Sequence, residues 1–144
     1  MPSKPQVFIS HSSTDAWVAR QISRFIIRCG ARCFLDEADI DIGDDFEEKI
    51  RKAATESNEL LILLTPWAIH RPYIWLETGV FWGAEKRIVG VLHGLTAKDL
   101  AKLEKIPVLL KRIDLIELND IESYFAQLKR RIKIRGVHHG KKQI

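Results

Sequence analysis

The chain has 144 residues, of which 46% are hydrophobic and 29% charged, a balance that excludes a disordered chain and indicates one folded domain. No apolar run approaches the roughly 20 residues that cross a bilayer, and residues 1–10 lack the apolar core of a signal peptide, so we expect a cytoplasmic protein without a membrane partner. The net charge of +4 gathers in residues 129–144, but this segment lacks interleaved aromatic residues and any recognisable motif, so a nucleic-acid partner is not expected.

Apolar runs and amphipathic stretches alternate along the chain. Residues 59–65 form a continuous apolar run, which is typical of a strand covered on both faces, and Pro72 opens a helix that ends in basic residues. In chain order, the predicted elements are strand 6–10, helix 16–29, strand 31–36, helix 45–57, strand 59–65, helix 72–86, strand 87–92, helix 96–105, edge strand 113–118 and helix 121–133.

This alternation predicts an α/β fold with a parallel sheet and right-handed crossovers. The length fits a flavodoxin-like, doubly wound sheet of five strands in the order 2-1-3-4-5, with helices on both faces. We expect one domain over residues 1–135 and a basic, flexible C-terminal tail over 136–144. Ligands of such sheets bind at the carboxyl ends of the strands, beside strands 1 and 3, so the loops after the first three strands are the candidate site.

Two cysteines flank the predicted end of the first helix. Cys29 and Cys33 are not spaced as a redox or zinc pair, and no further Cys/His set accompanies them. We therefore expect buried free thiols, which suit a reducing cytosol.

The segment after the first strand is rich in hydroxyl and acidic side chains. Helix capping explains such residues, but hydroxyls and free N–H groups at a helix start also suit a phosphate or a ribose, and the composition leaves both readings open. Neither standard nucleotide-binding loop is present, and no nucleophile elbow supports a hydrolase triad. The residues concerned are Ser10, His11, Ser12, Ser13 and Asp15.

The acidic loop over residues 36–45 does not match a calcium-binding pattern, because Gly43 does not stand at the sixth position after a suitable acid. We therefore expect no metal there. Its two isoleucines, Ile40 and Ile42, indicate contact with a partner as an alternative to a solvated loop.

One carboxylate is surrounded in the sequence by aromatic and apolar residues. Glu77 lies in the stretch "HRPYIWLETG" at 70–79, and burying an unpaired carboxylate is costly. Its place just beyond the loop after the third strand puts it near the expected ligand-binding edge.

Four segments together resemble one family. "VFISHSSTD", "CFLDEADIDIGDDFEEKI", "ELLILLTPW" and "RPYIWLETG" occur in the order found in bacterial TIR (Toll/interleukin-1 receptor) domains, and the similarity spans residues 6–134. Many such domains cleave NAD⁺ at the nicotinamide–ribose bond, and some make cyclic ADP-ribose isomers. The resemblance implies that Glu77 is the catalytic glutamate and that Tyr73 replaces a tryptophan usual in the family.

The resemblance also implies roles for neighbouring residues. The substrate-binding candidates, besides Glu77, are Ser10, His11, Asp36, Trp67, Tyr73 and Trp75. The family's BB loop, which commonly mediates TIR–TIR assembly, corresponds to residues 36–46, with Asp39, Ile40, Ile42, Gly43 and Asp44 as assembly candidates.

The resemblance thus implies an NAD⁺ nucleosidase, in some members a cyclase, that is activated by self-assembly in antiphage defence. NAD⁺ is its substrate and no cofactor is expected, because the departing nicotinamide becomes neutral without a metal. Its partners would be other TIR domains and an effector that senses the nucleotide product. Two alternatives stay open: a non-catalytic adaptor module, and a nucleoside deoxyribosyltransferase-like enzyme, which also uses a glutamate at a ribosyl carbon.

Overall fold

The computed structural model describes residues 4–35, 46–103 and 113–142, and for residues 46–47 and 136–142 it describes the backbone alone. The strands are β1 (Gln6–Ser10), β2 (Arg32–Leu35), β3 (Glu59–Leu64), β4 (Arg87–Leu92) and β5 (Asp114–Glu117). The helices are α1 (Ala16–Arg28), α2 (Phe46–Glu56), α3 (Pro72–Gly83), α4 (Ala97–Ala101) and α5 (Ile121–Lys142).

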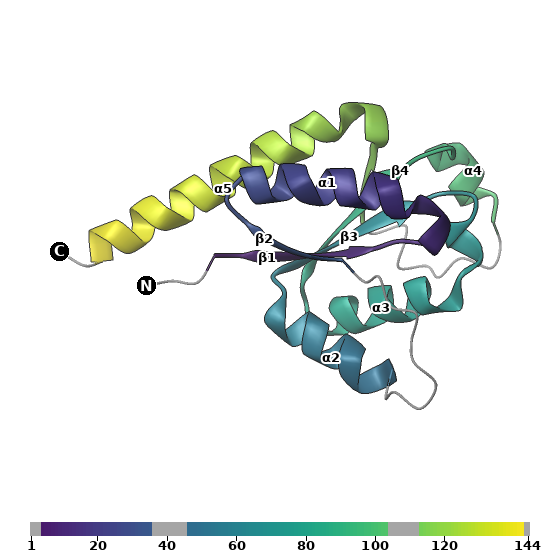
Figure 1. The fold of residues 1–144 in the computed structure, drawn as a ribbon, viewed down its shortest axis with the longest axis horizontal. Coiled ribbons are helices and arrows are strands. Elements are labelled where there is room, and N and C mark those ends of the chain that lie inside the picture. The colour runs from purple at the N-terminus through teal and green to yellow at the C-terminus, as the bar shows by residue number, and fades with distance from the viewer. Residues whose placement is uncertain (1–3, 36–45, 104–112, 143–144) are drawn as a thin grey trace.

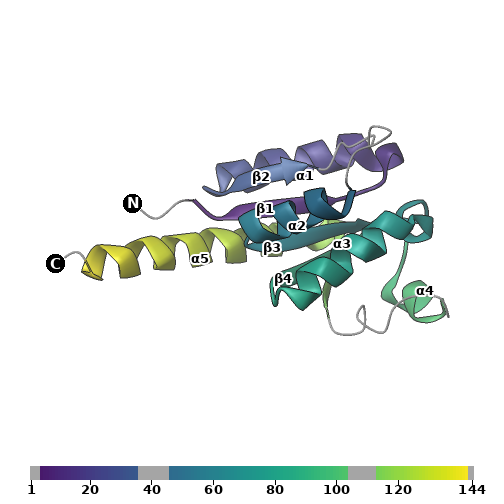
Figure 2. The ribbon, with the colours of Figure 1, turned by 90° about the horizontal axis from the view of Figure 1, so that it is seen from below.

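The five strands form one sheet in the order β2-β1-β3-β4-β5, and every neighbouring pair is parallel. The predicted flavodoxin-like topology is therefore confirmed. Helices α1 and α5 cover one face of the sheet and α2 and α3 cover the other (Figures 1 and 2). Each face has its own apolar core, with Phe8 and Phe81 in one and Ile9 and Leu128 in the other.

The central strand is buried on both faces, as its continuous apolar run predicts. All residues of β3 are buried, whereas the edge strands β2 and β5 have only exposed and half-buried residues. Next to β3, Gly90 of β4 is closely covered, because a Cβ there would lie 2.7 Å from the Leu115 side chain and 3.0 Å from the Leu64 side chain, so these side chains would have to shift. This close packing keeps the sheet layers tight beneath the candidate site.

The last helix differs from its predicted extent. The sequence pattern predicts a helix over 121–133 and a tail from residue 136, but α5 continues to Lys142 and projects beyond the sheet (Figures 1 and 2). Tyr124 and Leu128 anchor the first turns in the core. Once a helix is nucleated, each further residue adds a hydrogen bond at low cost, which allows α5 to continue past Gly136 and Gly140.

The fourth helix confirms its predicted cap. Thr96 accepts a hydrogen bond from the Asp99 backbone, while the Asp99 side chain accepts one from the Thr96 backbone. The bond that the Asp99 carboxylate accepts from the Thr96 backbone, together with its interaction with the Thr96 hydroxyl, holds the pKa of Asp99 below its usual value. No helix in the described part of the chain is long and apolar enough to cross a membrane.

Both cysteines are free thiols, as predicted, and both are half-buried. Burial raises the pKa of Cys33 from 9.0 to about 11. The thiolate is the reactive form, so at about pH 8 we expect Cys33 to react with iodoacetamide about a hundredfold more slowly than an unperturbed thiol. Timed alkylation followed by peptide mass spectrometry measures this, with the urea-unfolded chain as reference. Equal rates in the folded and unfolded chains would contradict the expectation.

Candidate functional site

Glu77 lies against the carboxyl-terminal half of β1. It stands one helical turn after Tyr73 and one turn before Phe81 on α3. The Tyr73 hydroxyl donates a hydrogen bond of 2.9 Å to the His11 carbonyl oxygen, and the Phe81 ring lies 5.6 Å from the Phe8 ring. These two contacts bracket Glu77 and place it over the end of β1, where it is completely buried.

Ser10 faces the same layer as Glu77. Side chains alternate along a strand, so Ser10 points to the side on which Phe8 meets α3. The Ser10 hydroxyl is buried, and no side chain or backbone group among residues 4–35, 46–103 and 113–142 makes a hydrogen bond to it. The edge predicted from the topology thus brings Ser10 and Glu77 together.

His11 follows with a defined tautomer. Its Nδ1 lies 2.8 Å from the Ser12 carbonyl oxygen, and because a carbonyl only accepts, Nδ1 carries the proton when the ring is neutral. The buried Nε2 is then an acceptor, and no group among the described residues donates a hydrogen bond to it. Ser10 Oγ and His11 Nε2 are thus two buried polar atoms without a partner in the described part of the chain, which is uncommon in a folded protein and makes this edge the candidate site.

Asp15 connects the loop after β1 with the loop after β3 through hydrogen bonds. Its Oδ2 accepts hydrogen bonds from the hydroxyls of Ser12 at 2.8 Å and Thr65 at 2.5 Å. Thr65 in turn accepts a bond of 3.1 Å from the Ala68 backbone, so one buried carboxylate connects the ends of β1 and β3. The sequence indicated Asp15 as one of several capping candidates, but it makes no side-chain cap bond and instead joins two loops.

The aromatic candidates are divided between the site and its rim. Tyr73 is half-buried and contacts the loop after β1, whereas the Trp75 indole donates a bond of 3.0 Å to the Ile69 carbonyl and faces the loop after β3. Trp67 is 53% exposed at the start of that loop. Tyr73 therefore belongs to the site, and Trp75 supports the loop that leads into it.

Several predicted residues cannot be placed. Asp36, and the assembly candidates Asp39, Ile40, Ile42, Gly43 and Asp44, lie outside the described residues. Within the described ranges, no group of three or more His, Cys, Asp or Glu side chains is arranged to hold a metal ion.

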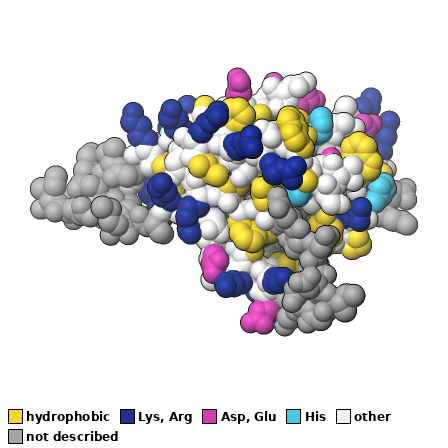
Figure 3. Space-filling view, in the orientation of Figure 1, with side chains coloured by type: hydrophobic (Ala, Val, Ile, Leu, Met, Phe, Trp, Pro, Cys, Tyr) yellow, Lys and Arg dark blue, Asp and Glu magenta, His cyan; other side chains and the backbone are white. Residues whose placement is uncertain are grey.

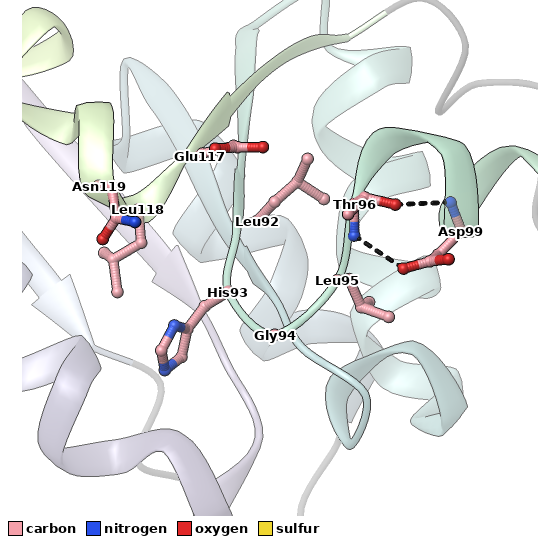
Figure 4. A pocket seen from close by; sticks show the side chains of 9 residues that line it. All are labelled: Leu92, His93, Gly94, Leu95, Thr96, Asp99, Glu117, Leu118 and Asn119. Atoms are coloured by element: carbon pink, nitrogen blue, oxygen red, sulfur yellow. Dashed lines mark hydrogen bonds between the residues drawn. The ribbon is translucent and has the colours of Figure 1, made fainter.

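A cavity of about 270 Å³ lies along the same edge of the sheet, at the ends of β4 and β5. Figure 4 shows His93, Glu117 and Asn119 around it, with the Thr96–Asp99 pair on the far side. His93 is joined to the site region through its backbone, which donates to the Leu64 carbonyl oxygen at 2.9 Å. Sequence reasoning missed this cavity, although the rule that ligands bind at carboxyl ends applies to these strands too.

The family model described as "TIR domain" matches residues 7–132. This chain belongs to the TIR domain family. The resemblance drawn from the sequence is thereby confirmed.

This TIR domain is similar in sequence to a plant protein. A protein of Brachypodium distachyon named "Probable 2' cyclic ADP-D-ribose synthase BdTIR" is 28% identical over 100 residues, which make up 68% of this chain and 45% of that protein. The chain thus spans less than half of that relative's length.

Two solved structures share the fold of this TIR domain. The TIR domain of the Toll-related receptor TRR-2 from Hydra magnipapillata has a TM-score of 0.63 at 21% identity, covering 88% of this chain and 97% of that one. The CMP N-glycosidase BcmB of Clostridium botulinum has a TM-score of 0.56 at 16% identity, covering 85% and 97%.

Proposed function

We propose that this TIR domain cleaves NAD⁺ at the bond between nicotinamide and ribose, with Glu77 as the catalytic carboxylate. The observation that carries the proposal is the complete burial of Glu77 beside Ser10 and His11 at the ligand-binding edge of the sheet. A buried carboxylate is costly for stability, and such groups are concentrated at functional sites. The relationship to a protein named as a cyclic ADP-ribose synthase supports the same chemistry.

The reaction needs one negative charge at the ribosyl carbon. The C1′–N bond breaks, its electron pair passes to the nicotinamide nitrogen, and the pyridinium becomes neutral nicotinamide. The ribosyl centre gains oxocarbenium character, as in glycoside hydrolysis. Glu77 stabilises this positive charge from a site shielded from water, where electrostatic interactions are strong.

An oxygen or nitrogen nucleophile completes the reaction. Attack by water, which loses a proton, gives ADP-ribose, and attack by a group of the same nucleotide gives a cyclic isomer. In this proposal Ser10 and the acceptor Nε2 of His11 hydrogen-bond ribose hydroxyls, and Tyr73 with Trp67 or Trp75 packs against the rings of the substrate. Asp36 would complete the pocket from the end of the second strand.

We further propose that activity depends on self-association with other TIR domains through the loop containing Asp39, Ile40, Ile42, Gly43 and Asp44. In this view the product is read by a downstream effector in antiphage defence, and the protein acts in the cytoplasm.

The decisive measurement follows nicotinamide. Purified protein at high concentration, with and without a crowding agent, is incubated with NAD⁺, and the products are separated by chromatography. Release of nicotinamide together with ADP-ribose or a cyclic isomer is expected. No release under any assembling condition would favour the adaptor alternative, and base exchange on 2′-deoxynucleosides would favour the deoxyribosyltransferase alternative.

Removing the Tyr73 hydroxyl is expected to weaken the site without destroying it. A Tyr73→Phe protein loses the bond to the His11 carbonyl, and a hydrogen bond of this kind contributes about 1 kcal/mol. We expect nicotinamide release, measured as kcat/KM, to fall about fivefold, and the free energy of unfolding to fall by about 1 kcal/mol. Tyr73→Trp, which restores the family's usual residue, is the comparator. Equal activity of Tyr73→Phe and wild type would show that the hydroxyl does not position the loop.

A further inference from the structure

A basic pocket lies at the edge of the sheet opposite to Glu77. A cavity of about 200 Å³, open to solvent, is lined by residues at the amino ends of β1, β3 and β4 and on α5, and Pro5, Leu128 and Ile132 form its apolar part. Its charged lining consists of Arg87 from β4, Arg131 and Arg135 from α5, and Glu59 from β3. Glu59 and Arg87 are register partners on the neighbouring strands β3 and β4. Arg131 and Arg135 stand one turn apart on α5, so the charged groups of the pocket are carried by regular elements and not by loops.

Glu59 holds one of the arginines in place. This carboxylate is 3% exposed and accepts a hydrogen bond of 2.7 Å from the Tyr124 hydroxyl. Arg131 donates to both of its oxygens, at 2.8 and 3.4 Å. Burial and the adjacent carboxylate raise the pKa of Tyr124, so the phenol stays protonated and continues to donate.

Arg131 retains donors for a ligand. A guanidinium has five N–H groups, and two contacts to Glu59 leave others unused on a side chain that is 34% exposed. Arg87 and Arg135 are exposed. With Glu59 already engaged by Tyr124 and Arg131, the lining carries an excess of two positive charges.

The surroundings add to this charge. Pro5 also lines the cavity, and its neighbour Lys4 is linked to Arg32 by a bond from Arg32 Nε to the Lys4 carbonyl oxygen. Figure 3 shows Lys and Arg side chains spread over the α1–α5 side and toward the end from which α5 projects. A small anion would therefore meet a positive field before it enters the pocket.

We infer that this pocket binds the phosphoryl group of a small anion. Guanidinium groups match phosphate oxygens in planar, paired hydrogen bonds, and the buried Glu59 orients one guanidinium before the ligand arrives. The volume accommodates a phosphate ester or a diphosphate. The pocket lies at the amino ends of the strands and Glu77 at the carboxyl ends, so this inference does not rest on the proposed NAD⁺ cleavage.

Titration calorimetry with inorganic pyrophosphate tests the inference. The wild-type chain is expected to bind with a dissociation constant of about 1 mM or tighter at low ionic strength, and an Arg87→Gln/Arg135→Gln protein at least about tenfold more weakly. Arg131 is left intact because its removal would strand the buried Glu59. The matched control is Arg24→Gln/Arg130→Gln, which removes the same charge from exposed positions on α1 and α5 and is expected to change affinity less than about twofold.

The outcomes distinguish specific anion binding in this pocket from non-specific attraction of anions to the positively charged protein. Absence of pyrophosphate binding, equal losses in the two double variants, or binding to oligonucleotides alone would overturn the inference. Sedimentation with phosphatidylcholine vesicles that contain phosphatidic acid then identifies the source of the phosphoryl group. Co-sedimentation that requires Arg87 and Arg135 identifies a lipid headgroup, and pyrophosphate binding without co-sedimentation identifies a soluble anion.

Discussion

A Glu77→Gln protein is expected to release nicotinamide from NAD⁺ at least about a hundredfold more slowly than the wild type. Glutamine has nearly the shape of glutamate but no negative charge, so it cannot balance the positive charge that develops on the ribosyl carbon. Glu77 is completely buried, which means that water does not replace the lost charge. The rate is measured by chromatography of nicotinamide at saturating and at low NAD⁺.

The melting temperature of the Glu77→Gln protein shows whether a loss of nicotinamide release is caused by unfolding. Because glutamine keeps the size and shape of the buried glutamate side chain, the Glu77→Gln protein is expected to stay folded and to melt close to the wild-type temperature. Glu56→Gln removes the same charge from an exposed position on α2 and is expected to leave the rate unchanged. If Glu77→Gln and wild type release nicotinamide equally fast, Glu77 is not the catalytic carboxylate.

The second large effect is expected at Asp15. An Asp15→Ala protein leaves the hydroxyls of Ser12 and Thr65 without their buried acceptor. Each of these two buried hydroxyls left without an acceptor costs about 1–3 kcal/mol, so we expect the free energy of unfolding to fall by about 2–6 kcal/mol. Urea unfolding followed by circular dichroism measures this change.

Asp15 variants also test how the site is supported. Asp15→Asn keeps one acceptor oxygen and is expected to lose less stability than Asp15→Ala. Asp114→Ala changes an exposed carboxylate on the edge strand β5 and is expected to alter stability by less than about 0.5 kcal/mol. A loss in Asp15→Ala no larger than in Asp114→Ala would show that the network between β1 and β3 does not stabilise the fold.

The topology could be predicted from the sequence because its signals are local. The apolar run of β3 and the start of α3 at Pro72 are encoded within a few neighbouring residues, and together with the topological rule they placed Glu77 at the correct edge. The helix ends were predicted less well. α5 continues to Lys142 because packing of its first turns, which periodicity does not report, nucleates the rest.

Contacts between distant residues could not be predicted in the same way. The bond from Tyr73 to the His11 carbonyl spans 62 residues, and the pair Tyr124–Glu59 spans 65. Nothing in the local sequence distinguishes Glu59, a buried acid at the start of a strand, from an exposed one. Its two partners lie on α5, and only the assembled fold brings them together.

The bracketing of Glu77 limits how activity can be regulated. α3 contacts the β1 region on both sides of this residue, through the Phe8–Phe81 ring contact and the Tyr73–His11 hydrogen bond. The segment of α3 between these two contacts is therefore held in position at both ends. Moving the Glu77 carboxylate would require both contacts to break, which is costly in a packed core. Any activation of the proposed NAD⁺ cleavage is therefore expected to change the groups that cover the carboxylate, while Glu77 stays in place.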